Sequence, residues 1–193
     1  TPRYLPNEES VNELSKVLIE NLLEFNESST NSTTKFFSDA VEGLMGGMIW
    51  KLKTSYPQYC TLPHLIAIFQ SMTTKQLVTF VSSNITSRSM ASAFINGMDS
   101  DKQTAGVKST LANAFKKIGS QQLFMALSKD EVPLNINSKD NPAVICIVNH
   151  PKYESAYSPI IAAIMHTVIK QMSVRGQQSS FLMMEEAPTI KLL

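Results

Sequence analysis

Apolar residues recur at steps of three and four over much of the chain, which is the spacing of one face of an α-helix. The first series begins after Asn7, whose side chain suits the N-terminal cap of a helix. Its apolar members are Val11, Leu14, Leu18, Leu22 and Phe25. Similar segments continue from 34 to 119, where Thr61 and either Thr73 or Thr74 can cap further helices. The pattern therefore predicts an N-terminal helix followed by a small helical bundle.

Three glycines interrupt the longest predicted helix, which spans about 34 to 54. Gly43, Gly46 and Gly47 each cost roughly 1 kcal/mol relative to alanine within a helix. A close crossing would offset this cost, because a residue without Cβ lets a second backbone approach. We therefore expect another helix to cross the longest one near these glycines.

The period of the pattern changes after residue 119, where strand-like and helix-like segments alternate. Residues 143–148 and 180–184 are apolar runs, as in strands that are buried on both faces of a parallel sheet. Between them, Ser158 is suited to cap a helix with Pro159 at its first position. A strand, a helix and a strand of these lengths form a right-handed βαβ unit. We therefore predict an α/β fold that carries a large helical insert.

Composition and charge narrow the choice of function. The chain has 193 residues, of which 17 are basic and 16 acidic, for a net charge of +1. No overall field therefore attracts nucleic acid or an anionic membrane, so any contact with DNA must be local. Cys60 and Cys146 form neither a CxxC pair nor a cluster with histidine, which argues against a zinc site. No apolar run reaches the roughly 18 residues that span a bilayer.

An acidic pair, Glu185 and Glu186, directly follows the apolar residues 181–184. In an open α/β sheet, ligands bind beyond the carboxyl ends of the strands, where this pair is expected to emerge. The arrangement is typical of a Walker B strand, in which one carboxylate holds Mg²⁺ and a second orients or deprotonates the attacking water. We assign the first role to Glu185, directly or through a bridging water, and the second to Glu186. The alternative is a pair of solvent-facing carboxylates without a catalytic role.

Several short stretches form an ordered set along nearly the whole chain. They are Pro2-Arg3-Tyr4-Leu5-Pro6, Thr104-Ala105-Gly106-Val107-Lys108-Ser109-Thr110-Leu111, Asn141-Pro142-Ala143-Val144, Asn149-His150-Pro151, Ala156-Tyr157-Ser158-Pro159-Ile160 and Glu185-Glu186-Ala187-Pro188. In their order and spacing they resemble the TraG/TraD coupling proteins of type IV secretion, especially forms from Bacteroides-like conjugative elements.

The resemblance implies a membrane-anchored, homo-hexameric ATPase that recruits a relaxase–DNA complex and passes it to the secretion channel. It also implies a RecA-like P-loop NTPase core with an inserted all-helical domain. On this basis 1–30 belong to the nucleotide-binding domain, 31–119 form the helical domain, and 120–193 form part of the nucleotide-binding α/β domain. ATP and Mg²⁺ are the implied cofactors of the intact protein, which would work on the cytoplasmic side of the bacterial inner membrane.

The phosphate-binding loop of such an ATPase is absent from the sequence, since no G-x-x-x-x-G-K-[ST] pattern occurs. The chain also starts at Thr1 without an initiator methionine and stops at Leu193 shortly after an apolar run. We therefore expect a fragment of the intact ATPase, without bound ATP or Mg²⁺ and without turnover of its own. The rival interpretation is a non-enzymatic helical adaptor that binds another protein through its bundle.

Two polar residues, Asn149 and His150, follow the apolar run 143–148. Because they precede the predicted Walker B strand by one strand, they are candidate sensors of the γ-phosphate. The alternative is a capping or turn role in the sequence Asn-His-Pro.

Lysines provide the candidate contacts to DNA or to the relaxase–DNA complex. Lys108, Lys116 and Lys117 lie along the last helix of the predicted bundle. Lys51 and Lys53 lie at the end of the longest one. Scattered lysines more often form a solvated helix face, which is the alternative here.

Overall fold

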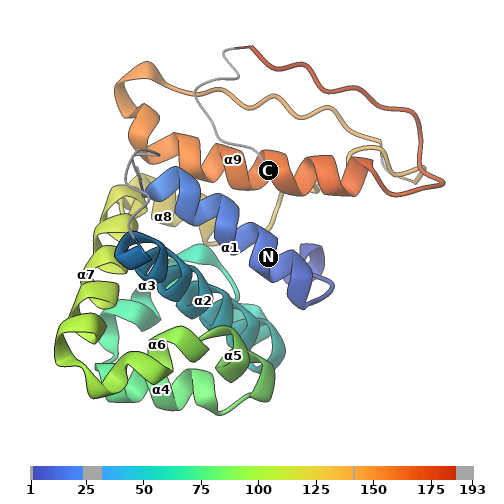
Figure 1. Ribbon diagram of the computed structural model, residues 1–193. Coiled ribbons are helices and arrows are strands. Elements are labelled where there is room, and N and C mark those ends of the chain that lie inside the picture. The colour runs from blue at the N-terminus through green and yellow to red at the C-terminus, as the bar shows by residue number, and fades with distance from the viewer. Residues whose placement is uncertain (1, 24–31, 141, 186–193) are drawn as a thin grey trace.

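In the computed structural model, residues 2–23, 32–140 and 142–185 are described, and the regular elements within them are helices (Figure 1). The α-helices are α1 (Glu8–Leu22), α2 (Ser32–Ser55), α3 (Leu62–Ser71), α4 (Thr74–Ser82), α5 (Ile85–Met90), α6 (Ser92–Asn96), α7 (Asp101–Ile118), α8 (Gln121–Leu127) and α9 (Glu154–Met172). The short 3₁₀ helices are η1 (Pro2–Tyr4), η2 (Pro57–Tyr59), η3 (Gly97–Asp99) and η4 (Pro151–Tyr153). The predicted N-terminal helix and helical bundle are therefore confirmed over their described residues.

Three helices begin where the predicted caps place them. The Asn7 side chain accepts a hydrogen bond from the Ser10 backbone N–H at 2.9 Å and caps α1. Thr61 and Thr73 cap α3 and α4 by accepting from the backbone N–H groups of the third residue along. Each bond satisfies one of the backbone donors that a helix leaves unpaired at its start. The capping residues thus determine where these helices start.

α2 is the central helix and contacts α1, α5, α6 and α7. Its glycines permit the close crossing that the sequence predicts. A Cβ on Gly43 would overlap the carbonyl oxygen of Met90 in α5, and one on Gly47 would lie 2.7 Å from the carbonyl oxygen of Ser87. The missing side chains therefore let the α5 backbone lie directly against α2.

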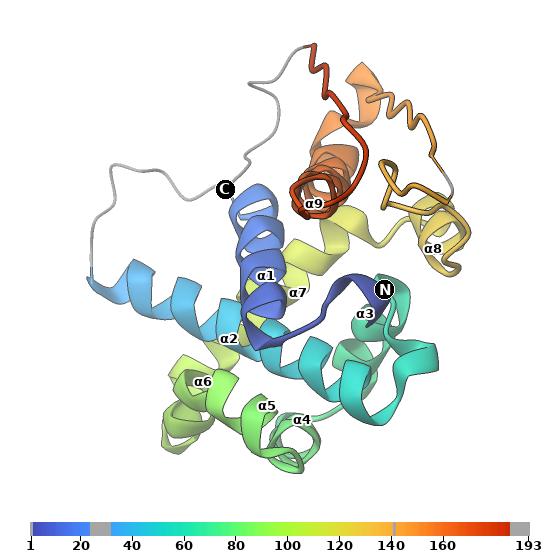
Figure 2. The same cartoon turned by 90° about the vertical axis from the view of Figure 1, so that its right-hand side faces the viewer.

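A hydrophobic core joins the bundle to α9. Its fully buried side chains include Leu44, Met48, Phe94, Leu111 and Phe115. The cluster of buried apolar residues extends from Leu5 to Ile160, so α9 shares the core with the bundle. α1 lies between α2 and α9 and contacts both (Figure 2). Within the described ranges, no helix combines the length and the apolar character needed to cross a bilayer.

The predicted α/β fold is wrong for the part of the chain that the structure describes. Residues 143–148 and 180–184 are extended but belong to no strand or sheet. A strand exists through backbone hydrogen bonds to a neighbouring strand, and no such bond joins these two segments among the described residues. An apolar run indicates a buried strand only if neighbouring elements cover it. Here Val144 is 96% exposed and Phe181 is 87% exposed. The described chain is therefore helical with two extended segments, and it contains no RecA-like parallel sheet.

The helix between these segments also begins earlier than predicted. α9 starts at Glu154, so Ser158 is not its cap and Pro159 is not its first residue. The reason is η4, which winds the chain from Pro151 and leads directly into α9. The side chain of His150 caps this 3₁₀ turn, so helical winding is already established before Ser158 is reached.

Candidate functional site

Two extended segments run beside α9 (Figure 1). Residues 143–149 lead into η4 and α9, and residues 178–185 return after α9, so both run in the same direction along this helix (Figure 1). The first segment ends with Asn149, and Glu185 is the last described residue of the second. Among the predicted site residues, Asn149 and His150 therefore lie directly before η4 and α9, and Glu185 lies on the segment that returns beside α9.

Glu185, predicted to hold Mg²⁺, is exposed at the end of the second segment. Glu186, predicted to activate water, lies outside the described residues. The residues before the pair are also accessible, from 38% for Leu182 to 87% for Phe181. Glu185 therefore follows an exposed segment and not the buried strand that the sequence predicts. Across the described ranges, no three His, Cys, Asp or Glu side chains gather in a group that could hold a metal ion.

Asn149 and His150 are engaged in turn and capping bonds. Asn149 Nδ2 donates to Ser158 Oγ at 3.2 Å, and Asn149 Oδ1 accepts from the His150 backbone N–H at 2.9 Å. His150 Nδ1 accepts from the backbone N–H of Lys152 at 3.2 Å, and its ring lies 5.1 Å from that of Tyr153. These bonds hold the turn between the first extended segment and α9. A sensor role for the two residues stays a prediction.

The described residues among the predicted site residues do not by themselves fit ATP and Mg²⁺. A triphosphate is bound by convergent backbone N–H groups and cationic side chains, and Mg²⁺ requires oxygen ligands fixed in octahedral geometry. The structure provides the exposed carboxylate of Glu185, together with Asn149 and His150, which are bonded within their own turn.

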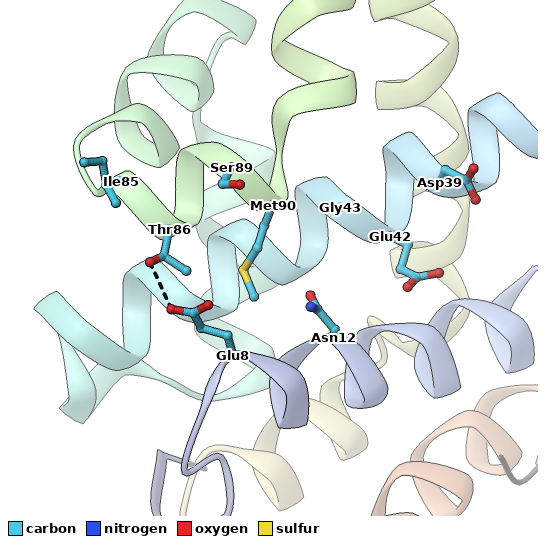
Figure 3. A pocket seen from close by; sticks show the side chains of 9 residues that line it. All are labelled: Glu8, Asn12, Asp39, Glu42, Gly43, Ile85, Thr86, Ser89 and Met90. Atoms are coloured by element: carbon cyan, nitrogen blue, oxygen red, sulfur yellow. Dashed lines mark hydrogen bonds between the residues drawn. The ribbon is translucent and has the colours of Figure 1, made fainter.

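A cleft of about 640 Å³ lies between α1, α2 and α5 (Figure 3). Its polar walls are formed by Glu8, Asn12, Asp39, Glu42, Thr86 and Ser89. The Thr86 hydroxyl donates a hydrogen bond to Glu8 Oε1 at 3.1 Å and so links α5 to α1. Three carboxylates give the cleft a negative potential, which favours a cationic or hydrogen-bond-donating group and repels a phosphate.

Glu42 in this cleft has an altered acidity. Burial raises the pKa of Glu42, and the neighbouring charges of Asp39 and Glu20 raise it further against an opposing effect of Lys16. The sequence does not predict the cleft, because its walls come from helices that are far apart along the chain. The one available signal is Gly43, which lines the cleft and allows α5 to approach α2.

The predicted DNA contacts on α7 lie in different environments. Lys108 is half-buried: its Nζ donates to the Met72 carbonyl oxygen at 3.4 Å and lies 6.0 Å from the ring centre of Phe69. Lys116 and Lys117 are exposed in the last turn of α7, where positive charge also stabilises the carbonyl end of the helix. Lys108 therefore has a packing role, whereas contact of Lys116 and Lys117 with DNA stays a prediction.

Comparison with known proteins identifies no family for this chain. No protein-family model, no curated protein and no solved structure matches it. The resemblance to coupling proteins therefore rests on the ordered short stretches of the sequence.

Proposed function

We propose that this chain is part of an ATP-driven coupling protein that links a relaxase–DNA complex to a type IV secretion channel. The proposal rests on the ordered stretches that resemble TraG/TraD coupling proteins. In this proposal the intact protein is a membrane-anchored homo-hexamer, ATP and Mg²⁺ are its cofactors, and this segment works on the cytoplasmic side of the bacterial inner membrane.

The course of the two extended segments is compatible with the proposal. Both run in the same direction beside α9, and one leads to the turn at Asn149 and His150 while the other leads to Glu185 (Figure 1). A nucleotide site assembled from several segments takes polar groups that follow such segments. Glu185 and Glu186 are proposed to act there on Mg²⁺ and on the attacking water, once the phosphate-binding loop is supplied by the rest of the protein.

Replacement of Glu186 by Gln in the intact protein tests this function. The change keeps size and hydrogen bonding but removes the base, so we expect ATP hydrolysis to fall at least about 100-fold and DNA transfer between cells to be lost. ATP binding should persist, because a water-activating carboxylate contributes little to the affinity for nucleotide. Hydrolysis and DNA transfer are measured on the same variant.

The matched control is Glu131→Gln, which changes an exposed carboxylate that is paired with Lys129 at 3.5 Å on the surface. This variant should hydrolyse ATP and transfer DNA as the parent does. Normal hydrolysis by Glu186→Gln would remove Glu186 from catalysis. Absence of ATP hydrolysis in the intact parent itself would favour the rival function, a helical adaptor that binds a protein through its bundle.

A further inference from the structure

An apolar cavity of about 310 Å³ lies between helices that are far apart along the chain. Its walls are formed by α1, α2, α3 and α9, together with the end of α8 and residues 129–134 (Figure 2). Residues of the hydrophobic core line it, each at most 6% exposed: Leu18, Leu52, Cys60, Leu65 and Ile160. The cavity is therefore continuous with the core of the bundle.

The size of this cavity exceeds that of an ordinary packing defect. Protein interiors pack about as densely as organic crystals, and few of their voids are larger than a water molecule. A cavity of roughly 150 Å³ lined by aliphatic and aromatic side chains stays dry and binds one benzene molecule. The volume of about 310 Å³ is roughly twice that figure, which is enough for about two fused rings. An α-helix with its side chains, roughly 10 Å across, is too wide for this volume.

The polar groups in the wall already have partners within the protein. The Tyr4 hydroxyl accepts a hydrogen bond from the Leu134 backbone N–H at 2.7 Å, and Thr167 Oγ1 donates to the Ala163 carbonyl oxygen at 2.8 Å. Burial raises the pKa of the Cys60 thiol, so this wall residue is uncharged at neutral pH. An extended peptide would bring backbone N–H and C=O groups that need new partners here. The wall thus favours a ligand without strong hydrogen-bonding groups.

The rim of the cavity carries ion pairs whose charges cancel. The lining residues that are exposed to solvent lie within 126–132. Among them, Asp130 forms an ion pair with Arg3 at 2.6 Å, and Glu131 forms one with Lys129 at 3.5 Å. Two cations are therefore matched by two carboxylates, and the rim provides no net charge to attract an ionic headgroup.

We propose that this cavity is a binding site for a small neutral apolar molecule, about the size of two fused aromatic rings. The hydrophobic effect drives the binding, since the ligand and the wall both lose contact with water. Neither Asn149, His150 nor Glu185 lines the cavity. The proposed site is therefore separate from the predicted nucleotide site and does not depend on the function proposed above.

The probe for this site is 1-aminonaphthalene, a two-ring molecule that is uncharged at neutral pH. Its emission moves to shorter wavelength when it leaves water for an apolar environment. Titration of the 193-residue chain with the probe should give a saturable shift of emission, and naphthalene should displace the probe. The competitor 1-naphthoate has the same rings and a carboxylate. It should displace the probe at least about tenfold less effectively than naphthalene, because an ionised group is costly to remove from water.

A substitution on α9 tests whether the probe lies in the cavity. Ala163→Leu places a larger side chain in the cavity wall, so the affinity for the probe should fall at least about tenfold as the free volume is filled. Ala156→Leu is the matched control, because Ala156 is also a half-buried alanine of α9 but does not line the cavity. Its affinity should equal that of the parent. Circular dichroism verifies that both variants are folded, and Ala163→Leu should unfold at the same or a higher urea concentration, as expected when an existing cavity is filled.

Three results would overturn the proposal. The absence of a saturable emission shift would exclude a site for a two-ring apolar ligand. Equal displacement by 1-naphthoate and naphthalene would exclude a preference for neutral ligands. Unchanged affinity in Ala163→Leu, or an equal loss in Ala156→Leu, would place the probe outside the cavity. These results leave the test of Glu186 unaffected, because that test measures ATP hydrolysis and DNA transfer and not binding in this cavity.

Discussion

The helical bundle and the two extended segments are similarly apolar in sequence but differ in what covers them. Leu44, Leu111 and Phe115 in the bundle are fully buried, whereas Val144 and Phe181 in the extended segments lie almost entirely in solvent. Helices satisfy their backbone hydrogen bonds internally, so they can pack as soon as their apolar faces meet. An extended segment must find a neighbour for its backbone as well as for its side chains. Apolar sequence therefore stabilises the bundle by itself but leaves the extended segments uncovered.

The sharpest test of this contrast replaces one phenylalanine in each region. Phe115 packs edge-on against Phe69 with ring centroids 5.2 Å apart, and it has no accessible surface. Phe115→Ala should lower the free energy of unfolding by about 3–5 kcal/mol, because it removes a large buried side chain and leaves a cavity. Phe181→Ala should change this free energy by less than about 0.5 kcal/mol. Urea denaturation measures both, and equal losses would show that the second extended segment is buried in solution.

A smaller effect tests how closely the bundle is packed at the crossing of α2 and α5. Gly43→Ala places a Cβ against the Met90 carbonyl oxygen, so we expect a net loss of about 1–2 kcal/mol after the gain in helix propensity. Gly46→Ala is the matched control, because its Cβ would meet Ser15 Oγ at 3.4 Å. This variant should be more stable by up to about 1 kcal/mol. Thermal unfolding compares the two, and a stabilised Gly43→Ala variant would contradict the close crossing.

The smallest expected effect concerns α9, which connects the two regions through a charged contact with α1. Lys170 Nζ lies 2.8 Å from Glu13 Oε1, and His166 Nε2 lies 3.6 Å from Glu13 Oε2. Burial lowers the pKa of His166 despite the opposing effect of Glu13. As the pH falls, His166 is therefore protonated in the unfolded chain before it is protonated in the folded chain. The free energy of unfolding decreases as the pH falls from about 6.5 towards the lower pKa of the folded state.

His166→Leu should flatten this part of the profile of stability against pH, because it removes the titrating group. His150→Gln serves as the control, since it changes an exposed histidine near the start of α9 and should retain the slope. Unfolding at several pH values between 5 and 7.5 measures both variants. An unchanged slope in His166→Leu would exclude His166 as its source.

Local signals account for the parts of the fold that the sequence predicts well. Asn7, Thr61 and Thr73 act within one turn of their own helices, and the caps predicted there are present. Ala91 shows the limit of such signals, because the chain leaves the helical conformation there, between α5 and α6, although the sequence contains no Gly or Pro at that point. α8 (Gln121–Leu127) is a short helix that the change of pattern after residue 119 conceals.

Local sequence signals also fail to predict the contacts of the candidate sites, which join residues far apart along the chain. The sequence shows Asn149 and His150 as polar residues at the end of an apolar run, but their bonds to Ser158 and Lys152 depend on where α9 begins. The acidic cleft has no counterpart in any local pattern. Glu8 and Thr86, which meet across it, come from helices far apart in the sequence.

By itself, the sequence determined which segments wind into helices and where several of them begin, because propensity, periodicity and capping operate between residues a few positions apart. It also determined the charge of each segment, including the acid-free interval from Gly43 to Met98. Only the tertiary structure decided which apolar runs are covered, since burial requires a partner surface that the run does not encode. In 143–148 only every second residue is partly covered, and 180–184 is exposed throughout, so the same apolar pattern that predicts a buried sheet leads to two largely exposed segments beside α9.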